Sequence, residues 1–162
     1  MKKWNDRPFE IRNLFNPAFC AVVLLRSIQG YEELDSAGIP FTLSIIVLPL
    51  CLHKETREII SSKSRSYLLK IVSDTPQILI GLPNRTSSLL PYTFEALGYA
   101  MQLELFEVTN DGRLKSRESK FRKKIDGTLE SIECQRSARI IGKRFAEIGD
   151  RATIYASLGI RL

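Results

Sequence analysis

The sequence has little of what enzymes and metalloproteins use in their sites. Its 162 residues include one histidine, His53, and three cysteines that lie far apart, Cys20, Cys51 and Cys134. No two cysteines have the C-x-x-C spacing of a zinc or redox site. No G-x-S-x-G nucleophile motif accompanies the histidine, and the phosphate-binding patterns G-x-x-x-x-G-K-[S/T] and G-x-G-x-x-G do not occur. We therefore expect no catalytic residues, no metal and no cofactor, and a protein that is not an enzyme.

Long apolar runs are missing as well. The longest apolar stretches are residues 18–25 and 38–52, and Pro49 interrupts the second. Both are shorter than the ~20 apolar residues that a membrane-spanning helix needs. The N-terminal residues MKKWNDRPFE carry basic charge but no apolar run behind it, so they do not resemble a secretory signal. Three cysteines without a pairing framework fit a reducing compartment, and we expect a cytoplasmic protein without membrane contact.

Positive charge is present in excess, but it is confined to one part of the chain. The net charge is +6 and the isoelectric point is about 9.4. Residues 113–144 carry eleven basic and four acidic side chains, whereas the rest of the chain carries 13 basic and 14 acidic side chains. Side chains at this density can neutralise phosphates. The predicted nucleic-acid-binding residues are Arg113, Lys115, Arg117, Lys120, Arg122, Lys123 and Lys124.

The length and the ordinary composition predict a single domain over residues 1–162, mainly α with some β structure (α+β). We expect a helical N-terminal part over 1–60 and a winged-helix-like part over 61–117. A C-terminal part over 118–162 should contain the basic linker, a long helix and a docking tail.

Helix signals dominate the first part. Asn16 followed by Pro17 is a favourable helix start, and the residues that follow are apolar on nearly every side, which predicts a helix at the centre of the fold. Its end is expected at Gly30 or at Gly38. A second helix should follow Pro40 and should kink or end at Pro49. A short charged helix or turn comes next, and then a third helix over 62–73.

Residues 61–117 have the element order of a winged helix-turn-helix. The pattern predicts a strand at 77–80, a short helix, a turn at 91–93, and a helix at 94–105 with an apolar stripe of Phe94, Leu97, Met101 and Leu105. Asn110-Asp111-Gly112 is a strong hairpin turn, because these residues tolerate positive φ. The hairpin over 106–116 would then be the wing.

The last part should be a helix over 127–148 that ends at Gly149, followed by an apolar tail. Ala138, Ile141, Phe145 and Ile148 form the predicted apolar stripe of this helix. A tail as apolar as DRATIYASLGIRL should dock on the core or on a partner.

Two smaller features each allow a structural and a functional interpretation. His53 is expected to be a structural histidine at a helix end rather than part of a catalytic group. The acidic residues Glu32, Glu33 and Asp35 are interpreted mainly as a solvated helix end, with a docking patch for a basic surface as the alternative.

Four segments resemble the middle component of three-component ABC systems (ABC-3C), which are bacterial antiphage and anti-plasmid defence systems related to Lamassu. The segments are RPFEIRNLFNPAFCAVVLLRSIQGY, GIPFTLSIIVLPLCLHKETRE, SSLLPYTFEALGYAMQLELF and RIIGKRFAEIGDRATIYASLGIRL. The resemblance implies a non-catalytic adaptor between an SMC-like ABC ATPase with coiled coils and an effector subunit, often a nuclease. It transfers no catalytic residue.

The expected helix before the wing argues against sequence-specific DNA binding. Residues 94–105 contain no Arg or Lys, whereas a helix that recognises bases in the major groove usually exposes Arg, Lys, Asn or Gln. We therefore favour an assembly module whose basic segment contacts the DNA backbone or an acidic protein surface. The alternative is a stand-alone winged-helix transcriptional regulator that binds DNA, and an enzyme is the least supported class.

Overall fold

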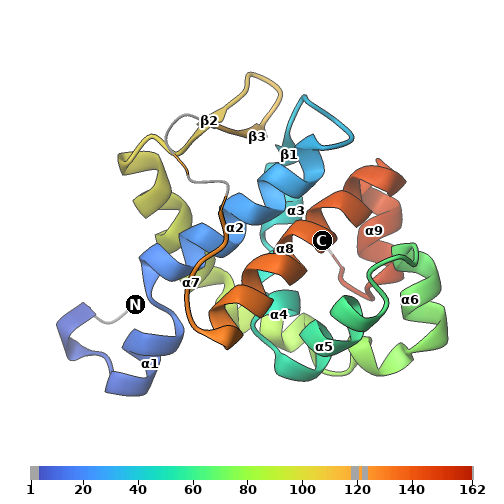
Figure 1. Ribbon diagram of the computed structural model, residues 1–162, viewed down its shortest axis with the longest axis horizontal. Coiled ribbons are helices and arrows are strands. Elements are labelled where there is room, and N and C mark those ends of the chain that lie inside the picture. The colour runs from blue at the N-terminus through green and yellow to red at the C-terminus, as the bar shows by residue number, and fades with distance from the viewer. Residues whose placement is uncertain (1–3, 118–120, 122–123, 162) are drawn as a thin grey trace.

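The chain folds as helices packed about one central helix, with a small sheet at one edge, in a computed structural model that describes residues 4–117, 121 and 124–161 (Figure 1). The elements in chain order are η1 (Trp4–Asp6), α1 (Phe9–Leu14), α2 (Pro17–Glu32), β1 (Ile39–Pro40), α3 (Phe41–Ser44), α4 (Val47–Cys51), α5 (Lys54–Ser62), α6 (Leu68–Asp74), η2 (Pro76–Leu79), α7 (Leu82–Gln102), β2 (Phe106–Val108), β3 (Arg113–Ser116), α8 (Leu129–Ile148) and α9 (Arg151–Ser157). The mainly helical fold with a minor β component is therefore confirmed.

Helix α2 is the central element, as its all-round apolar surface predicted. The Asn16 side chain caps it by accepting hydrogen bonds from the backbone N–H of Ala18 at 2.9 Å and of Phe19 at 3.4 Å, and Pro17 occupies the first helical position. The helix continues through Gly30 to Glu32, so Gly30 does not end it. It contacts α8 along one side and α7 along another, which places its apolar side chains in the core.

Helices α2 and α8 lie side by side and run in the same direction (Figure 1). Their contacts advance together along both helices, from Arg26 with Gln135 to Gly30 with Arg139. The two backbones touch at two glycines. A Cβ on Gly30 would lie 2.0 Å from the carbonyl oxygen of Arg139, and one on Gly142 would lie 1.9 Å from that of Ser27. Only residues without a side chain fit there, so the glycines determine how closely the helices pack.

A single helix, α7, replaces the predicted short helix, turn and second helix. Pro91 lies inside it, and within the predicted turn the Thr93 hydroxyl donates to the carbonyl oxygen of Leu89 at 3.1 Å, one helical turn back. The predicted apolar stripe is also wrong in part. Leu97 is buried, but Phe94 is 47% exposed and Met101 is 55% exposed. The buried face is made of smaller residues instead, Thr93, Ala96 and Ala100.

The predicted hairpin is confirmed, but the strand at 77–80 is wrong. Strands β2 and β3 pair antiparallel, with Glu107 opposite Lys115, and Gly112 at the turn has a φ of 75°. Residues 76–79 form the 3-10 helix η2. The third strand is β1, which pairs with β3 and gives the sheet order β1-β3-β2. The winged-helix arrangement stays a prediction.

The segment from Pro40 to Ser62 contains three short helices: α5 confirms the predicted short charged helix, whereas the expected kinked helix is divided into α3 and α4. The break falls at Ile45 and Ile46, between α3 and α4, and not at Pro49. Pro49 occupies the first turn of α4, where the missing N–H has no intrahelical partner to lose. Helix α5 ends at Ser62, so the predicted helix over 62–73 is shortened to α6.

The C-terminal part agrees with its prediction. Thr128 caps α8, Gly149 ends it with a φ of 70°, and Asp150 caps α9 by accepting a hydrogen bond from the N–H of Thr153 at 2.8 Å. In the stripe of α8, Ala138, Ile141 and Phe145 are buried and Ile148 packs against the core. Ile154, Tyr155 and Leu158 are buried too, so the tail docks on the core.

The three cysteines are buried and unpaired. Burial raises the pKa of the Cys20 thiol to about 12 and raises that of Cys51 further, so both thiols stay protonated at neutral pH. They are core residues, as expected for Cys20 and Cys51.

By length and composition alone, the stretch Phe9–Glu32 could cross a membrane. In the structure, Phe15 and Asn16 divide it into α1 and α2, and α2 is covered by α7 and α8. A core helix passes the same length and composition test.

Candidate functional site

The predicted basic segment lies at the exit of the hairpin, and the structure describes four of its seven residues. Lys120, Arg122 and Lys123 lie outside the described residues. Arg113 and Lys115 are on β3, Arg117 directly follows it, and Lys124 precedes α8. The described residues are therefore found on β3, directly after it, and just before α8.

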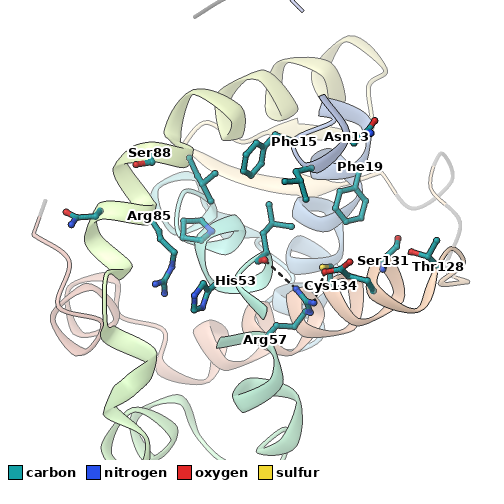
Figure 2. A pocket seen from close by; sticks show the side chains of 16 residues that line it. Asn13, Phe15, Phe19, His53, Arg57, Arg85, Ser88, Thr128, Ser131 and Cys134 are labelled. Carbon is teal, nitrogen blue, oxygen red and sulfur yellow. Dashed lines mark hydrogen bonds and ion pairs between the residues drawn. The ribbon is translucent and has the colours of Figure 1, made fainter. Parts of the chain in front are cut away.

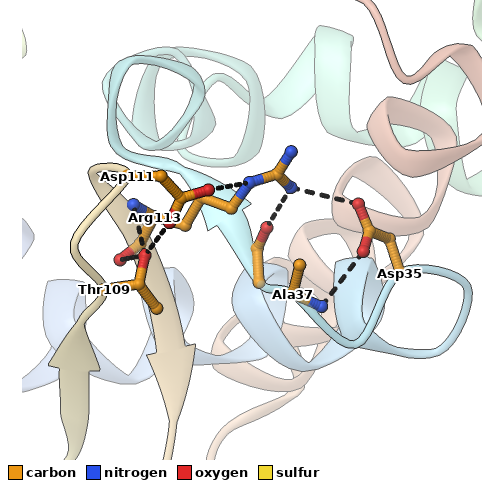
Figure 3. A network of polar contacts seen from close by, with 6 residues as sticks. Asp35, Ala37, Thr109, Asp111 and Arg113 are labelled. Carbon is orange, nitrogen blue, oxygen red and sulfur yellow. Dashed lines mark hydrogen bonds and ion pairs between the residues drawn. The ribbon is translucent and has the colours of Figure 1, made fainter.

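Arg113 belongs to an internal network and does not face outward as an open cation (Figure 3). Its guanidinium pairs with Asp35 at 3.0 Å and with Asp111 at 3.1 Å, and it donates to the carbonyl oxygen of Gly38 at 2.9 Å. Thr109 bonds to Asp111 and to the Arg113 backbone, which closes the turn. Arg113 thus ties the hairpin to the loop after α2.

Of the other described residues of the segment, Arg117 and Lys124 form ion pairs with acidic side chains and Lys115 is exposed. Arg117 lies 3.6 Å from Glu104 and 3.9 Å from Glu107, and Lys124 lies 3.2 Å from Asp126. Lys115 is exposed on β3. These ion pairs are solvent-exposed and weak, so a polyanion can compete for Arg117 and Lys124 more readily than for Arg113.

The acidic residues at the end of α2 bind basic and polar groups of their own chain. Glu32 accepts hydrogen bonds from the backbone N–H of Ser116 at 2.8 Å and from the Ser116 hydroxyl. Glu33 pairs with Arg139 and, at 3.4 Å, with Lys143. The interpretation as a merely solvated helix end was therefore wrong, because with Asp35 these carboxylates hold the hairpin and α8.

A second group of cations lies on α8 and was not assigned to a site from the sequence. Arg136, Arg139 and Lys143 follow at intervals of three and four, the spacing of one helix face. With Arg144 they line a hollow of about 470 Å³ that Ile125, directly after Lys124, also borders. The helical spacing of these cations is the signal that could have identified them.

An apolar groove of about 610 Å³, here called the His53 groove, lies among the helices (Figure 2). Side chains from the α1–α2 junction, the end of α4, α5, α7 and the start of α8 line it: Asn13, Leu14, Phe15, Phe19, Pro49, Leu52, His53, Arg57, Asn84, Arg85, Ser88, Leu89, Thr128, Glu130, Ser131 and Cys134. Four stretches that are distant in sequence, within residues 13–19, 49–57, 84–89 and 128–134, meet here, so no local motif could have predicted the groove.

His53 is a structural residue at a helix start. Its Nδ1 contacts the Thr56 hydroxyl at 2.9 Å and accepts a hydrogen bond from the Thr56 N–H at 3.4 Å, which makes it the N-cap of α5. Burial, and then the nearby Arg85 guanidinium, lower the pKa of His53, so the ring is neutral at pH 7. The expected helix-end role is right, but it is at the start of α5 and not at the end of the preceding helix.

Arg57 forms the floor of the groove and is only 2% exposed. It donates to the carbonyl oxygens of Cys51 at 3.1 Å and Leu52 at 3.5 Å, and its guanidinium lies 3.1 Å from Glu130 and 3.7 Å from Glu133. Carboxylates from α8 thus balance this buried charge.

Arg85 lies beside His53 on one flank of the groove (Figure 2). It donates to the carbonyl oxygen of Ile80 at 2.6 Å and to the Thr56 hydroxyl at 3.4 Å, and its Nε is buried without an acceptor. Within the part of the chain that the structure describes, no carboxylate lies within ion-pair distance of it. Burial lowers the pKa of Arg85 more than the charge of Glu55 raises it, which reflects a cation that lacks sufficient compensation.

Towards its C-terminal end, α7 exposes apolar side chains. Phe94 and Met101 lie seven residues apart on one face of the helix, and the rings of Phe94 and Phe41 stack with centroids 6.2 Å apart. Exposed apolar residues that gather on one face are typical of protein contact surfaces. This agrees with the absence of Arg and Lys from residues 94–105.

A family model described as the ABC-three component (ABC-3C) system Middle Component 3 matches residues 4–162. Comparisons with curated proteins and with solved structures gave no match. The family match covers all three predicted parts of the chain, including the hairpin and the groove. The chain therefore belongs to the Middle Component 3 family of ABC-three component systems.

Proposed function

We propose that this protein is a non-catalytic adaptor that bridges an SMC-like ABC ATPase and an effector subunit, often a nuclease, in a Lamassu-like antiphage complex of the bacterial cytoplasm. The observation that carries the proposal is the family match over residues 4–162. A middle component implies partner components, so protein contacts are the first property to look for. The apolar face of α7 and the His53 groove are surfaces suited to such contacts.

The sheet supports a winged-helix interpretation of the adaptor. Its order β1-β3-β2 places the hairpin beside a strand that follows the first long helix, and α7 directly precedes the hairpin. In this arrangement α7 would meet a partner protein through Phe94 and Met101, because it offers no basic side chain to a DNA groove.

Assembly is the direct test of the adaptor. We expect the protein to co-purify with the ATPase and with the effector encoded beside it, and to be required for those two to bind each other. The measurement is size-exclusion chromatography of the three purified components in every pairwise combination. If the isolated protein instead binds one specific duplex at nanomolar affinity in physiological salt and neither component, it is a stand-alone regulator.

Contact with the DNA backbone is a second part of the proposal. Lys115 and Lys124 are exposed, and further cations line the α8 hollow. We expect these cations to lie along DNA held by the complex without recognising its sequence, because they are not placed on a base-reading helix.

Reversing four charges of the segment should weaken DNA binding by the complex about tenfold or more at low salt, and the salt dependence of binding should become shallower because fewer phosphates are neutralised. The variant replaces with glutamate Arg117, Arg122, Lys123 and Lys124. A matched control, with the same change in net charge, replaces the exposed residues Lys54, Arg65, Lys70 and Arg151. Equal DNA affinity of the two variants, measured by fluorescence anisotropy, would rule out this contact while leaving assembly untouched.

A further inference from the structure

We infer that the His53 groove binds an apolar segment of a partner component that carries a carboxylate, and that Arg85 holds this carboxylate. The inference rests on the proposed adaptor function and specifies one of its contact sites. Three properties of the groove carry it: its shape, the unequal balance of its two arginines, and the apolar surface around its mouth.

The groove has the size and lining of a binding site. Its volume of about 610 Å³ is within the usual range for ligand pockets, and Phe15, Phe19, Leu52 and Leu89 supply apolar walls. An apolar side chain placed against these walls would be removed from water, and that burial is favourable at roughly 25 cal/mol per Å².

The charges inside the groove define where an anion can bind. Glu130 lies at the α8 side and already balances Arg57, so a carboxylate placed there would be repelled. Arg85 lies on the α7 side and donates only to neutral partners, Ile80 and Thr56, with its Nε unpaired. A half-buried guanidinium without a paired counter-charge is an incomplete site, and a carboxylate is the group that its donors fit best.

The neutral imidazole ring of His53 lies beside Arg85 in the groove. Nδ1 of His53 is used by Thr56, and among the described residues no hydrogen bond to Nε2 is seen. The ring can therefore donate from Nε2 to the same carboxylate, in the tautomer that leaves Nδ1 as the acceptor for Thr56.

The surroundings favour a protein segment over a small molecule. Leu14 lines the groove and is still 59% exposed, so apolar surface continues from the groove towards solvent. A partner segment that extends beyond the groove would cover this surface more fully than a small ligand inside it.

Blocking the groove should break one contact and leave the fold intact. We expect Ser88→Trp, which fills the groove from the exposed face of α7, and Arg85→Glu each to weaken binding of one purified component at least tenfold, measured by titration calorimetry. The matched controls Ser61→Trp and Lys70→Glu change exposed positions outside the groove and should stay within twofold of the original. Leu14→Glu at the mouth replaces Ser88→Trp if that variant melts early.

The occupant is then identified by cross-linking. A photoreactive group attached at Ser88→Cys should label a partner peptide that contains apolar residues and an Asp or Glu, and exchanging that acid for Arg should restore binding to the Arg85→Glu variant. Unchanged affinity of the groove variants overturns the inference but leaves the adaptor function standing, whereas failure of the original protein to bind either component overturns the adaptor function itself.

Two other occupants would also overturn the inference. One is a second copy of the chain, detected by light scattering as self-association that Ser88→Trp abolishes while partner binding stays unchanged. The other is a small carboxylate, detected with decanoate as a rise in melting temperature that Arg85→Glu removes, again with unchanged partner binding.

Discussion

Replacing Gly142 with alanine should destabilise the protein by about 3–5 kcal/mol, because the new methyl group has no space between α2 and α8. Its Cβ would lie 1.9 Å from the carbonyl oxygen of Ser27 and 2.9 Å from the backbone nitrogen of Tyr31. Both are backbone atoms of a central helix, which cannot rotate away as a flexible side chain can. The helices must therefore separate, and the close packing between them is weakened over several turns.

The measurement is urea unfolding followed by circular dichroism, supported by a thermal scan. For a chain of this length, each kcal/mol corresponds to roughly 2–4 °C of melting temperature, so a loss of about 6 °C or more is expected. Gly30→Ala should behave similarly, since its Cβ would lie 2.0 Å from the carbonyl oxygen of Arg139.

Gly98→Ala is the matched control within the same protein. Gly98 lies inside α7, in its C-terminal half, and is exposed, and a Cβ there would meet nothing within 4 Å. Alanine should therefore stabilise α7 by about 0.5–1 kcal/mol through its higher helix propensity. If Gly142→Ala were as stable as Gly98→Ala, the close α2–α8 contact would be wrong.

Elements with strong local signals could be predicted from the sequence. The Asn16-Pro17 start of α2, the Asn110-Asp111-Gly112 turn and the Gly149 end of α8 all depend on residues within one turn of the feature itself. Backbone sterics and capping decide these features, and neither needs information from the rest of the fold.

Elements that depend on tertiary contacts were predicted less well. Pro91 indicated a turn, yet α7 passes through it, because burial of the faces on both sides of Pro91 outweighs one lost hydrogen bond. Residues 77–80 are β-rich, but β3 pairs with Ile39–Pro40 instead, and those two residues were too short a run to indicate a strand.

The candidate sites also depend on tertiary contacts that the sequence alone does not show. The basic segment could be recognised from the number of its positive charges. Its ion-pair partners Asp35, Glu104 and Glu107 come from other parts of the chain, so the sequence could not show that Arg113 is already paired. The different charge balance of Arg57 and Arg85 follows only from which carboxylates the fold brings close to each.

Arg57→Ala should cost about 3 kcal/mol or more and should be the most damaging single change of a charged residue in the groove. Arg57 is buried, and its guanidinium joins the end of α4 to the start of α8 through the carbonyl oxygen of Cys51 and the carboxylate of Glu130. Alanine would leave the carbonyls of Cys51 and Leu52 without this donor and would also open a cavity under the groove.

Two further variants separate the causes of that destabilisation. Lys54→Ala, on the same helix, removes an exposed cation whose pairing with Glu58 spans 3.9 Å, and should change stability by no more than about 0.5 kcal/mol. Arg57→Met keeps most of the buried stem but none of the donors, so it should recover the packing part of the stability and not the hydrogen-bonding part. If Arg57→Met unfolds at the same urea concentration as the original protein, the guanidinium contributes nothing net to stability. The presence of a buried charge would then have to be explained by binding at the His53 groove, and the effect of Arg57→Met on partner affinity would become the decisive measurement.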